Sequence, residues 1–438
     1  MNNTKRKLKI GWSSNSPWGS SGYATQSNLI VKRLVKAGFP LAFNAFTGFF
    51  AGFMNRNNDE FQLSGDWSGV PFYPTLDHLY GSDGLWRNLQ NDFGADVVIP
   101  FQDVHTLTPQ DISKVKRLIP YVPIDRDPVP PAVLNPLRMS WKIITYSQWG
   151  HDVLKKAHFH STMIPHGVDT NIFKPVDKKE AKSKFGINSD TFVFGMIAAN
   201  KENPPRKGFQ QALDAFSEFY KKHPDSLFWF HSWVDQPGGF NIAEYAKFLG
   251  LGHAIRFIDH IDMVYMKSTD MNLLMNAFDC LVMPSFSEGF GLPAIEAQSA
   301  GVPVIVNDYS SLSELVIEGK TGYKCKPIMM RYDPFQSYVG DADAKEIYKA
   351  MESLYASNKE EKSKEARKHA VEKYDIDKIF NNQWLPYFEK IEEEIYGKKI
   401  PDVKVDVSSI SSDASNDLVV KALEKTMLEL GSDKIIVS

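Results

Sequence analysis

The sequence has only two cysteines, Cys280 and Cys325, among 438 residues, and it has no run of 18 or more apolar residues. Two thiols cannot form a disulfide framework, so we expect a reducing compartment and a cytoplasmic location. Without a long apolar run, we expect no membrane-spanning helix. Neither sign of charge is in excess, with 50 Lys and Arg against 53 Asp and Glu. This balance argues against a strongly basic nucleic-acid binder and leaves a local basic groove open.

The composition is that of a globular enzyme, with 43% hydrophobic and 24% charged residues. It excludes a disordered, collagen-like or coiled-coil chain. Short apolar segments alternate with amphipathic helices from end to end, which predicts an α/β fold with parallel sheets. The length favours two large domains. We place two Rossmann-like domains at residues 1–175 and 176–375, a helix at 376–398 that packs back on the first domain, and a linker with a terminal amphipathic helix at 399–438.

The apolar segments give specific strand and helix predictions. Strands are expected at Leu8–Trp12, Leu41–Phe46, Val97–Phe101, Pro120–Ile124, Ile143–Tyr146, Thr162–Pro165, Thr191–Ala198, Leu227–His231, Ile255–Ile258, Cys280–Met283 and Val302–Val306. Helices are expected at Tyr23–Lys36, Gly150–Lys156, Gly208–Lys221 and Ser311–Glu318, and after Gly291. The segment from Gly48 to about Gly84 is rich in Gly, Asn, Asp and aromatic residues, so we interpret it as a long loop system of the kind that is often functional.

One segment carries the strongest functional signal. An apolar strand ends at Met283, a glycine-rich turn follows, and a helix begins near Leu292. The free N–H groups and dipole of such a helix start bind phosphate, and glycines let a ligand approach the backbone. Glu288 and Glu296 flank the turn, eight positions apart, and could bracket one bound molecule. The spacing alone also fits a plain strand–turn–helix with two solvated glutamates.

The string from Pro284 to Glu296, continued by Ala300–Ile305, resembles the signature of GT-B glycosyltransferases. It is most similar to the retaining branch of glycogen synthases, sucrose synthases and mannosyltransferases, which is glycosyltransferase family 4-like. The resemblance covers roughly residues 8–398 and includes Pro165–Asp169, which matches the family's hinge segment. It implies two Rossmann-like domains that face each other across a cleft, with a C-terminal helix crossing back to the first domain.

The resemblance also implies roles for single residues of the second domain. Glu288 would bind hydroxyls of the donor sugar, and Glu296 would hold the nucleotide ribose. Arg206 and Lys207 match the basic pair that stabilises the leaving diphosphate, although other residues usually separate the two positions in relatives. Their alternative is an exposed basic pair at a helix start, where the dipole disfavours cations. Further donor contacts would come from Gly289, Phe290, Gly291 and Leu292, and, at the nucleobase, from His260 and Ile261.

The loop after the first strand resembles the family's glycine loop, which faces the cleft. Ser21 and Gly22 would then lie near the donor phosphate, and Ser20 and Tyr23 near the acceptor. The loop lacks the G-x-G-x-x-G pattern, so no dinucleotide site is expected. A tight strand–helix turn is the alternative interpretation.

A carboxylate and an imidazole follow the strand Val97–Phe101, at the edge where α/β proteins bind ligands. We expect Asp103 or His105 to orient the acceptor or to accept its proton. Asp125 and Arg126 are expected to face the cleft near the acceptor. Because Asp-x-Asp strings arise often by chance, we assign no metal to Asp125–Asp127 and expect no cofactor besides the nucleotide-sugar co-substrate.

The resulting prediction is a metal-independent, retaining glycosyltransferase that moves a sugar from a nucleoside-diphosphate sugar to a hydroxyl. An epimerase or hydrolase on the same fold, a glycoside phosphorylase and a non-catalytic nucleotide-sugar binding protein are the alternatives. The acceptor class stays open between glycan, lipid, protein and modified nucleobase in DNA. Aromatic residues of Phe39–Phe53 and Trp67–Tyr80 leave membrane-surface contact open, and the oligomeric state is also open.

Overall fold

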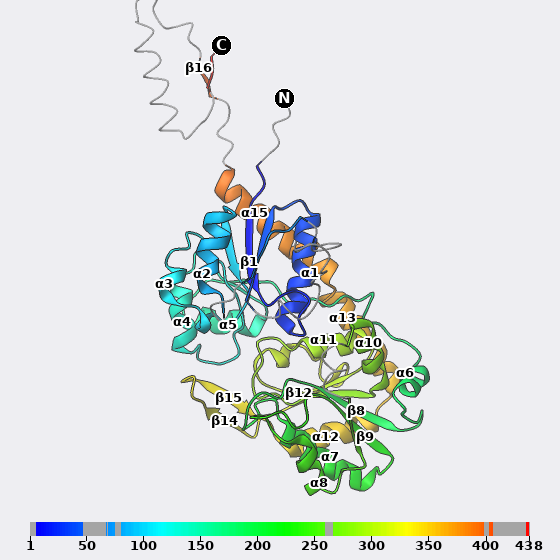
Figure 1. Ribbon diagram of the computed structural model, residues 1–438. Coiled ribbons are helices and arrows are strands. Elements are labelled where there is room, and N and C mark those ends of the chain that lie inside the picture. Colours follow the sequence, from blue (N-terminus) through cyan, green and yellow to red (C-terminus); the bar gives the residue numbers. More distant parts are fainter. Residues whose placement is uncertain are drawn as a thin grey trace, which may run out of the picture. The chain divides into compact units, whose positions relative to one another are not determined.

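The computed structural model describes residues 6–46, 67, 69–74, 80–258, 266–397, 403–405 and 435–437. The chain divides into a large compact unit, Leu8–Leu385, and a small one made of Met1–Lys7 and Pro386–Ser438. Parallel sheets with helices around them form the large unit, which confirms the predicted α/β class (Figure 1). No helix of the described part of the chain has the length and apolar character needed to cross a membrane.

The first lobe of the large unit contains two parallel sheets. One has the strand order β3-β2-β1-β4 and the other β5-β6-β7. Their strands are β1 Ile10–Ser14, β2 Leu41–Ala45, β3 Phe72–Pro74, β4 Val97–Pro100, β5 Tyr121–Val122, β6 Ile144–Thr145 and β7 Thr162–Met163. The helical segments are α1 Gly22–Lys36, α2 Ser82–Gly84, the π-helix η2 Leu85–Asp92, the 3₁₀ turn η3 Val104–Thr106, α3 Pro109–Ile112, α4 Pro131–Arg138 and α5 Gln148–Lys156.

Strand β3 corrects the prediction that Gly48–Gly84 is loop throughout. Phe72 stacks on Phe43 of β2 with ring centroids 4.8 Å apart, and β3 pairs with β2 in parallel. Three residues are too few for the alternation of a strand to show in a sequence. Residues 47–66 lie outside the described part of the chain.

The second lobe is built on one parallel sheet with the order β10-β9-β8-β11-β12-β13. Its strands are β8 Phe192–Ile197, β9 Ser226–His231, β10 Ile255–Phe257, β11 Cys280–Met283, β12 Val304–Asn307 and β13 Gly322–Cys325. An antiparallel pair, β14 Met329–Tyr332 and β15 Tyr338–Asp341, follows. The helical segments are α6 Lys178–Lys184, α7 Phe209–Lys222, α8 Ile242–Phe248, α10 Ser268–Ala277, α11 Leu292–Ser299, η4 Ser310–Glu314, α12 Ala344–Tyr355 and α13 Lys359–Lys373.

The predicted α-helix at Ser311–Glu318 is wrong. The segment instead forms η4, a short 3₁₀ helix. Its start is set by Ser310, whose φ is +57°, and the chain turns again at Ile317, whose N–H donates to Thr321 Oγ1 at 2.9 Å. This local side-chain bond competes with helix continuation.

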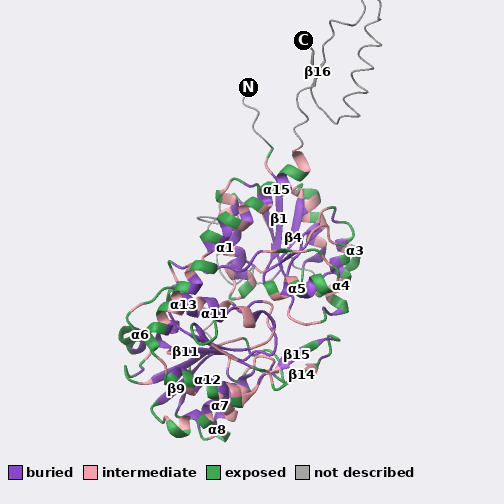
Figure 2. Ribbon diagram, turned by 180° about the vertical axis from the view of Figure 1, so that it is seen from behind, coloured by how far each residue is buried: buried purple, intermediate pink, exposed green. Residues whose placement is uncertain are grey.

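Phenylalanines fill the second core. Strands β9 and β11 of this lobe are buried along their whole length (Figure 2). Phe194 of β8, Phe228 of β9 and Phe216 of α7 are fully buried there. The strands are apolar on both faces because helices cover both faces of the sheet. Helix α7 buries only the apolar side chains of the face that lies against the sheet. The rigid core fixes the strand ends that carry the candidate site.

The chain returns to the first lobe after α13. Val168 and Asp375 form a parallel bridge, and α14 Ile376–Ile379 and the π-helix η5 Phe380–Trp384 follow. Trp384 is fully buried, with its ring 5.0 Å from Tyr121 and 6.1 Å from Trp12. Helix α15, Leu385–Tyr396, comes next. In the small unit, β16 Val403–Val405 pairs in parallel with β17 Ile435–Val437, while the expected helix around residues 419–430 lies outside the described residues.

Candidate active site

The predicted residues converge because they follow the carboxyl ends of parallel strands in both lobes. Gly22 begins α1, which follows β1. The loops after β4 and β5 carry Asp103 and Asp125, and the loop after β11 carries Glu288. In α/β folds ligands bind at this edge. Contacts join the two sets: a Cβ on Gly22 would lie 3.0 Å from Leu292 Cδ1, so the glycine loop of the first lobe touches the start of α11.

The loop between β11 and α11 is held from two sides. Gly291 has φ +114°, and a Cβ there would lie 2.7 Å from Leu312 Cδ2, so only glycine fits. Ser310 Oγ accepts the N–H of Glu288 at 2.9 Å. Ser311 Oγ lies within hydrogen-bond distance of the carbonyls of Glu288 and Phe290, at 2.7 and 2.8 Å. No sequence pattern pointed to these two serines: Ser311 begins the segment that was expected to be helical, and Ser310 directly precedes it.

Glu288 forms the centre of a charged cluster. Its carboxylate accepts a hydrogen bond from Lys207 Nζ and lies 3.7 Å from Arg206 Nη1. Burial alone would raise the pKa of Glu288, but the nearby charges of Lys207 and Arg206 lower it to about 2. The side chains of Glu288 and Lys207 are only 13% and 17% exposed. The alternatives of a solvated glutamate at position 288 and an exposed lysine at position 207 are therefore wrong.

Arg206 is fixed by more than one partner. Its Nη1 donates to the carbonyl of Ser287 at 2.9 Å, and its Nε lies 3.1 Å from Glu202. Gly208, with φ +74°, allows the close approach behind the pair: a Cβ there would lie 2.4 Å from the carbonyl oxygen of Pro284. The start of α7 therefore packs directly on the end of β11, which brings both cations to Glu288.

Glu296 has the opposite electrostatic environment. It lies on α11, and burial raises its pKa to about 7. Among the described residues it has no ion-pair partner. The two glutamates of the signature therefore differ: Glu288 is held ionised by cations, whereas Glu296 titrates near neutrality.

The glycine loop of the first lobe combines a structural and a contact role. Ser21 is the N-cap of α1, accepting the N–H of Ala24 at 3.1 Å, and its Oγ also accepts from Asn15 Nδ2 at 2.7 Å. Capping of this kind explains the local turn without a ligand. Ser20 is exposed in the turn before the helix.

A second acidic group lies at the first-lobe side of the cluster. The Tyr23 hydroxyl is hydrogen-bonded to Asp103. Burial and then the charge of Asp125 raise the pKa of Asp103, while His105 and Arg206 act in the other direction. The His105 side chain is exposed, and its ring centroid lies 5.3 Å from that of Phe335.

Arg126 bridges the two lobes. It pairs with Asp125 at 2.7 Å and, through Nε, with Asp333 at 2.8 Å. Asp333 was not foreseen, because it lies 207 residues away in the turn between β14 and β15. Asp127 pairs with Lys156 at 2.7 Å. In the described residues, no group of three or more His, Cys, Asp or Glu side chains is arranged to hold a metal ion.

An aromatic group supports the signature loop from the first lobe, and one of its members, Tyr146, was not singled out from the sequence. The rings of Tyr146 and His166 stack at 4.0 Å, and Phe290 meets His166 edge-on at 5.0 Å. A Cβ on Gly289 would lie 2.7 Å from Pro123 Cβ. Tyr146 directly follows β6, so the rule that ligand-side residues follow strand ends could have found it.

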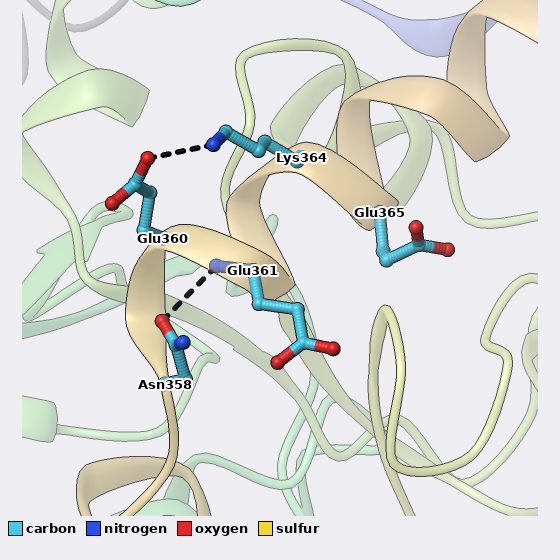
Figure 3. A pocket seen from close by; sticks show the side chains of 5 residues that line it. All are labelled: Asn358, Glu360, Glu361, Lys364 and Glu365. Atoms are coloured by element: carbon cyan, nitrogen blue, oxygen red, sulfur yellow. Dashed lines mark hydrogen bonds and ion pairs between the residues drawn. The ribbon is translucent and has the colours of Figure 1, made fainter.

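One surface hollow shares no residue with this cluster. This hollow, on α13, is lined by Asn358, Glu360, Glu361, Lys364 and Glu365 (Figure 3). Asn358 caps the helix there and Glu360 pairs with Lys364, so the hollow is explained by helix-end structure. His260 and Ile261, predicted at the nucleobase, lie outside the described residues.

Part of the chain is similar in sequence to known proteins. Residues 177–330 match the family model "Glycosyl transferases group 1". D-inositol 3-phosphate glycosyltransferase 2 of Catenulispora acidiphila is 32% identical over 169 residues, which cover 37% of this chain and 38% of that protein. The chain thus spans less than two fifths of the length of the curated relatives it matches.

Solved structures show the same fold. Sucrose-phosphate synthase of Thermosynechococcus elongatus superposes with a TM-score of 0.67 at 15% identity, covering 88% of this chain and 99% of that one. Anabaena HepE, crystallised with UDP and glucose, superposes with a TM-score of 0.64 at 16% identity, covering 87% and 100%. The predicted GT-B fold with two Rossmann-like domains is confirmed.

Proposed function

We propose that this protein transfers a sugar from a nucleoside-diphosphate sugar to a hydroxyl acceptor, because residues 177–330 match the group 1 glycosyltransferase model and the chain has a GT-B fold. The observation that carries the proposal is the convergence of Lys207, Arg206 and Glu288 beside the start of α11. Two cations and a helix N-terminus stabilise the negative charge that develops on a leaving diphosphate. We propose that this charge stabilisation works without a metal ion.

Each side chain of the second lobe has a distinct part in donor binding. Lys207 and Arg206 donate to the diphosphate, and the backbone N–H groups of 290–292 reach the phosphate and sugar. Glu288, ionised by its neighbours, accepts from hydroxyls of the donor sugar. Glu296 accepts from the ribose, and the ionised form that this requires is accessible near pH 7. UDP-sugars are the first donors to test, because HepE was crystallised with UDP and glucose.

The first lobe supplies the acceptor side. Asp103, held by Tyr23, and the exposed His105 are the groups placed to orient an acceptor hydroxyl. We propose retention by a same-face path, in which the leaving phosphate takes the acceptor proton as the new glycosidic bond forms. Trapping of a covalent glycosyl-enzyme would contradict this path.

The proposal is tested by following nucleoside diphosphate release from UDP-glucose, GDP-mannose and ADP-glucose in EDTA, with and without saccharide acceptors. Acceptor-dependent release, with the donor's anomeric configuration in the product by NMR, is expected. Equal release without acceptor would assign the site to a hydrolase or epimerase. Binding of donor without any release would make the protein a nucleotide-sugar binding protein.

A further inference from the structure

An antiparallel arm, residues 328–341, projects from the second lobe and contains β14 and β15 (Figure 1). Side chains alternate between the two faces of a strand, and directly paired residues share a face. One face of the arm therefore carries Ile328, Met330 and Tyr332 from one strand and Tyr338 from the other. These side chains are 65%, 45%, 59% and 42% exposed, an unusual set of large apolar groups to leave in water.

The apolar face continues onto the body of the protein. Gly340 lies on the same face as Tyr338, and a Cβ there would lie 3.0 Å from the Cβ and Cγ atoms of Tyr309. Glycine thus makes room for the Tyr309 ring, whose hydroxyl donates to the Tyr338 carbonyl at 2.8 Å. Trp149 of α5 meets Tyr309 edge-on at 5.6 Å, and Tyr332 meets Tyr338 at 5.3 Å. We call Trp149, Tyr309, Tyr338 and Tyr332 the aromatic strip.

The charges around the aromatic strip are balanced. Residues 326–341 hold two cations, Lys326 and Arg331, and two carboxylates, Asp333 and Asp341. Arg331 pairs with Asp341 at 2.8 Å, and Lys156, on the helix that carries Trp149, pairs with Asp127 at 2.7 Å. A phosphodiester chain or an anionic membrane is bound by surplus Lys and Arg, which this surface does not offer.

The arm also reaches the acceptor side of the candidate site. Its turn carries Asp333, which binds Arg126, and Phe335, whose ring lies against His105 and under the Arg126 guanidinium at 4.6 Å. Arg126 in turn holds Asp125. A chain lying along the strip would therefore end beside the groups that we assign to the acceptor.

We propose that the aromatic strip binds a neutral saccharide chain and holds it as the acceptor. Tyr and Trp rings present flat apolar faces with a polar edge, which suits the C–H faces and outward hydroxyls of pyranose rings. The role of the aromatic strip as an acceptor site rests on the proposed function, but its binding of a saccharide does not. A test of binding without nucleotide therefore separates the two.

The experiment is native gel electrophoresis of the full chain through gels that contain dextran, mannan or galactan. At least one polysaccharide should retard the protein, and Tyr332→Ala should raise the apparent dissociation constant about fivefold, as expected for loss of one stacking ring. Tyr332→Phe keeps the ring and should bind like the original. Phe248→Ala, which removes a side chain that is 81% exposed on α8, is the matched control and should not change retardation.

Three results would overturn the proposal. The first is no retardation by any of the three polysaccharides, and the second is equal retardation of the original and Tyr332→Ala. The third is a dimer in sedimentation, or pelleting with phosphatidylcholine vesicles, that Tyr332→Ala abolishes while saccharide binding is unchanged; this would assign the strip to a second copy or to a membrane. Loss of transferase activity with intact retardation would instead count against the proposed function alone.

Discussion

Lys207 and Glu288 form an ion pair across 81 residues of sequence. Lys207 stands just before α7 and Glu288 in the loop after β11, so two strand–helix junctions of one sheet meet in this pair. Each side chain changes the other's protonation: Glu288 opposes the lowering of the Lys207 pKa by burial, and Lys207 helps to keep Glu288 ionised. The pair thereby holds side by side the cation that we propose for the phosphate and the carboxylate that we propose for the sugar hydroxyls.

Replacement of Glu288 tests the sugar-binding half of this pair. Glu288→Gln keeps the shape but removes the charge that Lys207 and Arg206 face, and we expect the transfer rate to fall about 10²- to 10³-fold, as for loss of one preorganised polar group. Nucleoside diphosphate release measures the rate, and circular dichroism checks the fold. Glu202→Gln, which removes a half-exposed partner of Arg206, is the control and should retain most activity. An unchanged rate in Glu288→Gln would remove Glu288 from the donor site.

Replacement of Lys207 tests the diphosphate half. Lys207→Ala should weaken nucleoside diphosphate binding by about 1.5–3 kcal/mol, the range for a hydrogen bond to a charged group. Isothermal titration calorimetry measures the affinity. Lys221→Ala removes an exposed lysine from the far end of the same helix and should leave affinity unchanged. Equal affinity in the original and in Lys207→Ala would exclude Lys207 from the site.

Glu296 gives a prediction for pH dependence. Burial raises the pKa of Glu296 in the folded protein to about 7, above its unfolded value. The protonated carboxyl therefore costs no stability at low pH, and the free energy of unfolding falls as pH rises from about 4.5 through 7. Glu296→Gln has no such loss and should melt higher than the original at pH 8, with the difference vanishing near pH 4. Thermal melts across this range measure the difference. A constant difference would contradict the assigned titration.

The same group should couple nucleotide binding to pH. If the ionised carboxylate accepts from the ribose, affinity should rise about tenfold between pH 6 and pH 8 as Glu296 loses its proton. Glu296→Gln should lose this rise in nucleotide affinity. It should keep any pH dependence of the affinity that comes from titration of the nucleotide's own phosphate. Identical pH profiles in the two proteins would separate Glu296 from the nucleotide.

Asp103 is expected to show opposite effects on stability and on activity. Its raised pKa means that its ionisation costs stability as pH rises, so Asp103→Asn should be more stable than the original at pH 8 and equal to it at acidic pH. The same variant should lower kcat and leave the dissociation constant of the nucleotide unchanged, because we assign Asp103 to the acceptor side. Asp235→Asn, at an exposed loop position, is the control. Weaker nucleotide binding in Asp103→Asn would place Asp103 in the donor site instead.

The sequence predicted the parallel-sheet architecture and the donor-side cluster because both depend on local patterns. The apolar strand Cys280–Met283 is followed by a glycine-rich turn, and Glu288 and Glu296 flank that turn in the sequence. The convergence of Lys207 on Glu288 follows once both are placed at strand ends of one sheet.

The contacts between the lobes could not be predicted, since they join residues far apart in the chain. The Arg126–Asp333 pair spans 207 residues, and although Arg126 was expected at the cleft, no sequence pattern marks Asp333 as its partner. The roles of Ser310 and Ser311 could not be predicted because a helix was expected at Ser311–Glu318, whereas Ser310 takes a left-handed conformation that starts a 3₁₀ helix. Strand β3 was not predicted because three residues are too few to show the alternation of apolar and polar side chains that marks a strand.

Nucleotide binding tests the account most directly. Thermal melts would be recorded in EDTA with UDP, GDP, ADP and TDP and their sugar conjugates. One base class should stabilise the protein by about 2.7 kcal/mol at 100 times its dissociation constant. Lys207→Ala should reduce the stabilisation by the nucleoside diphosphate. Glu288→Gln should reduce the stabilisation by the sugar conjugate. No shift with any nucleotide, a shift that needs magnesium, or an undiminished shift in both variants would contradict a metal-independent donor site at Lys207 and Glu288.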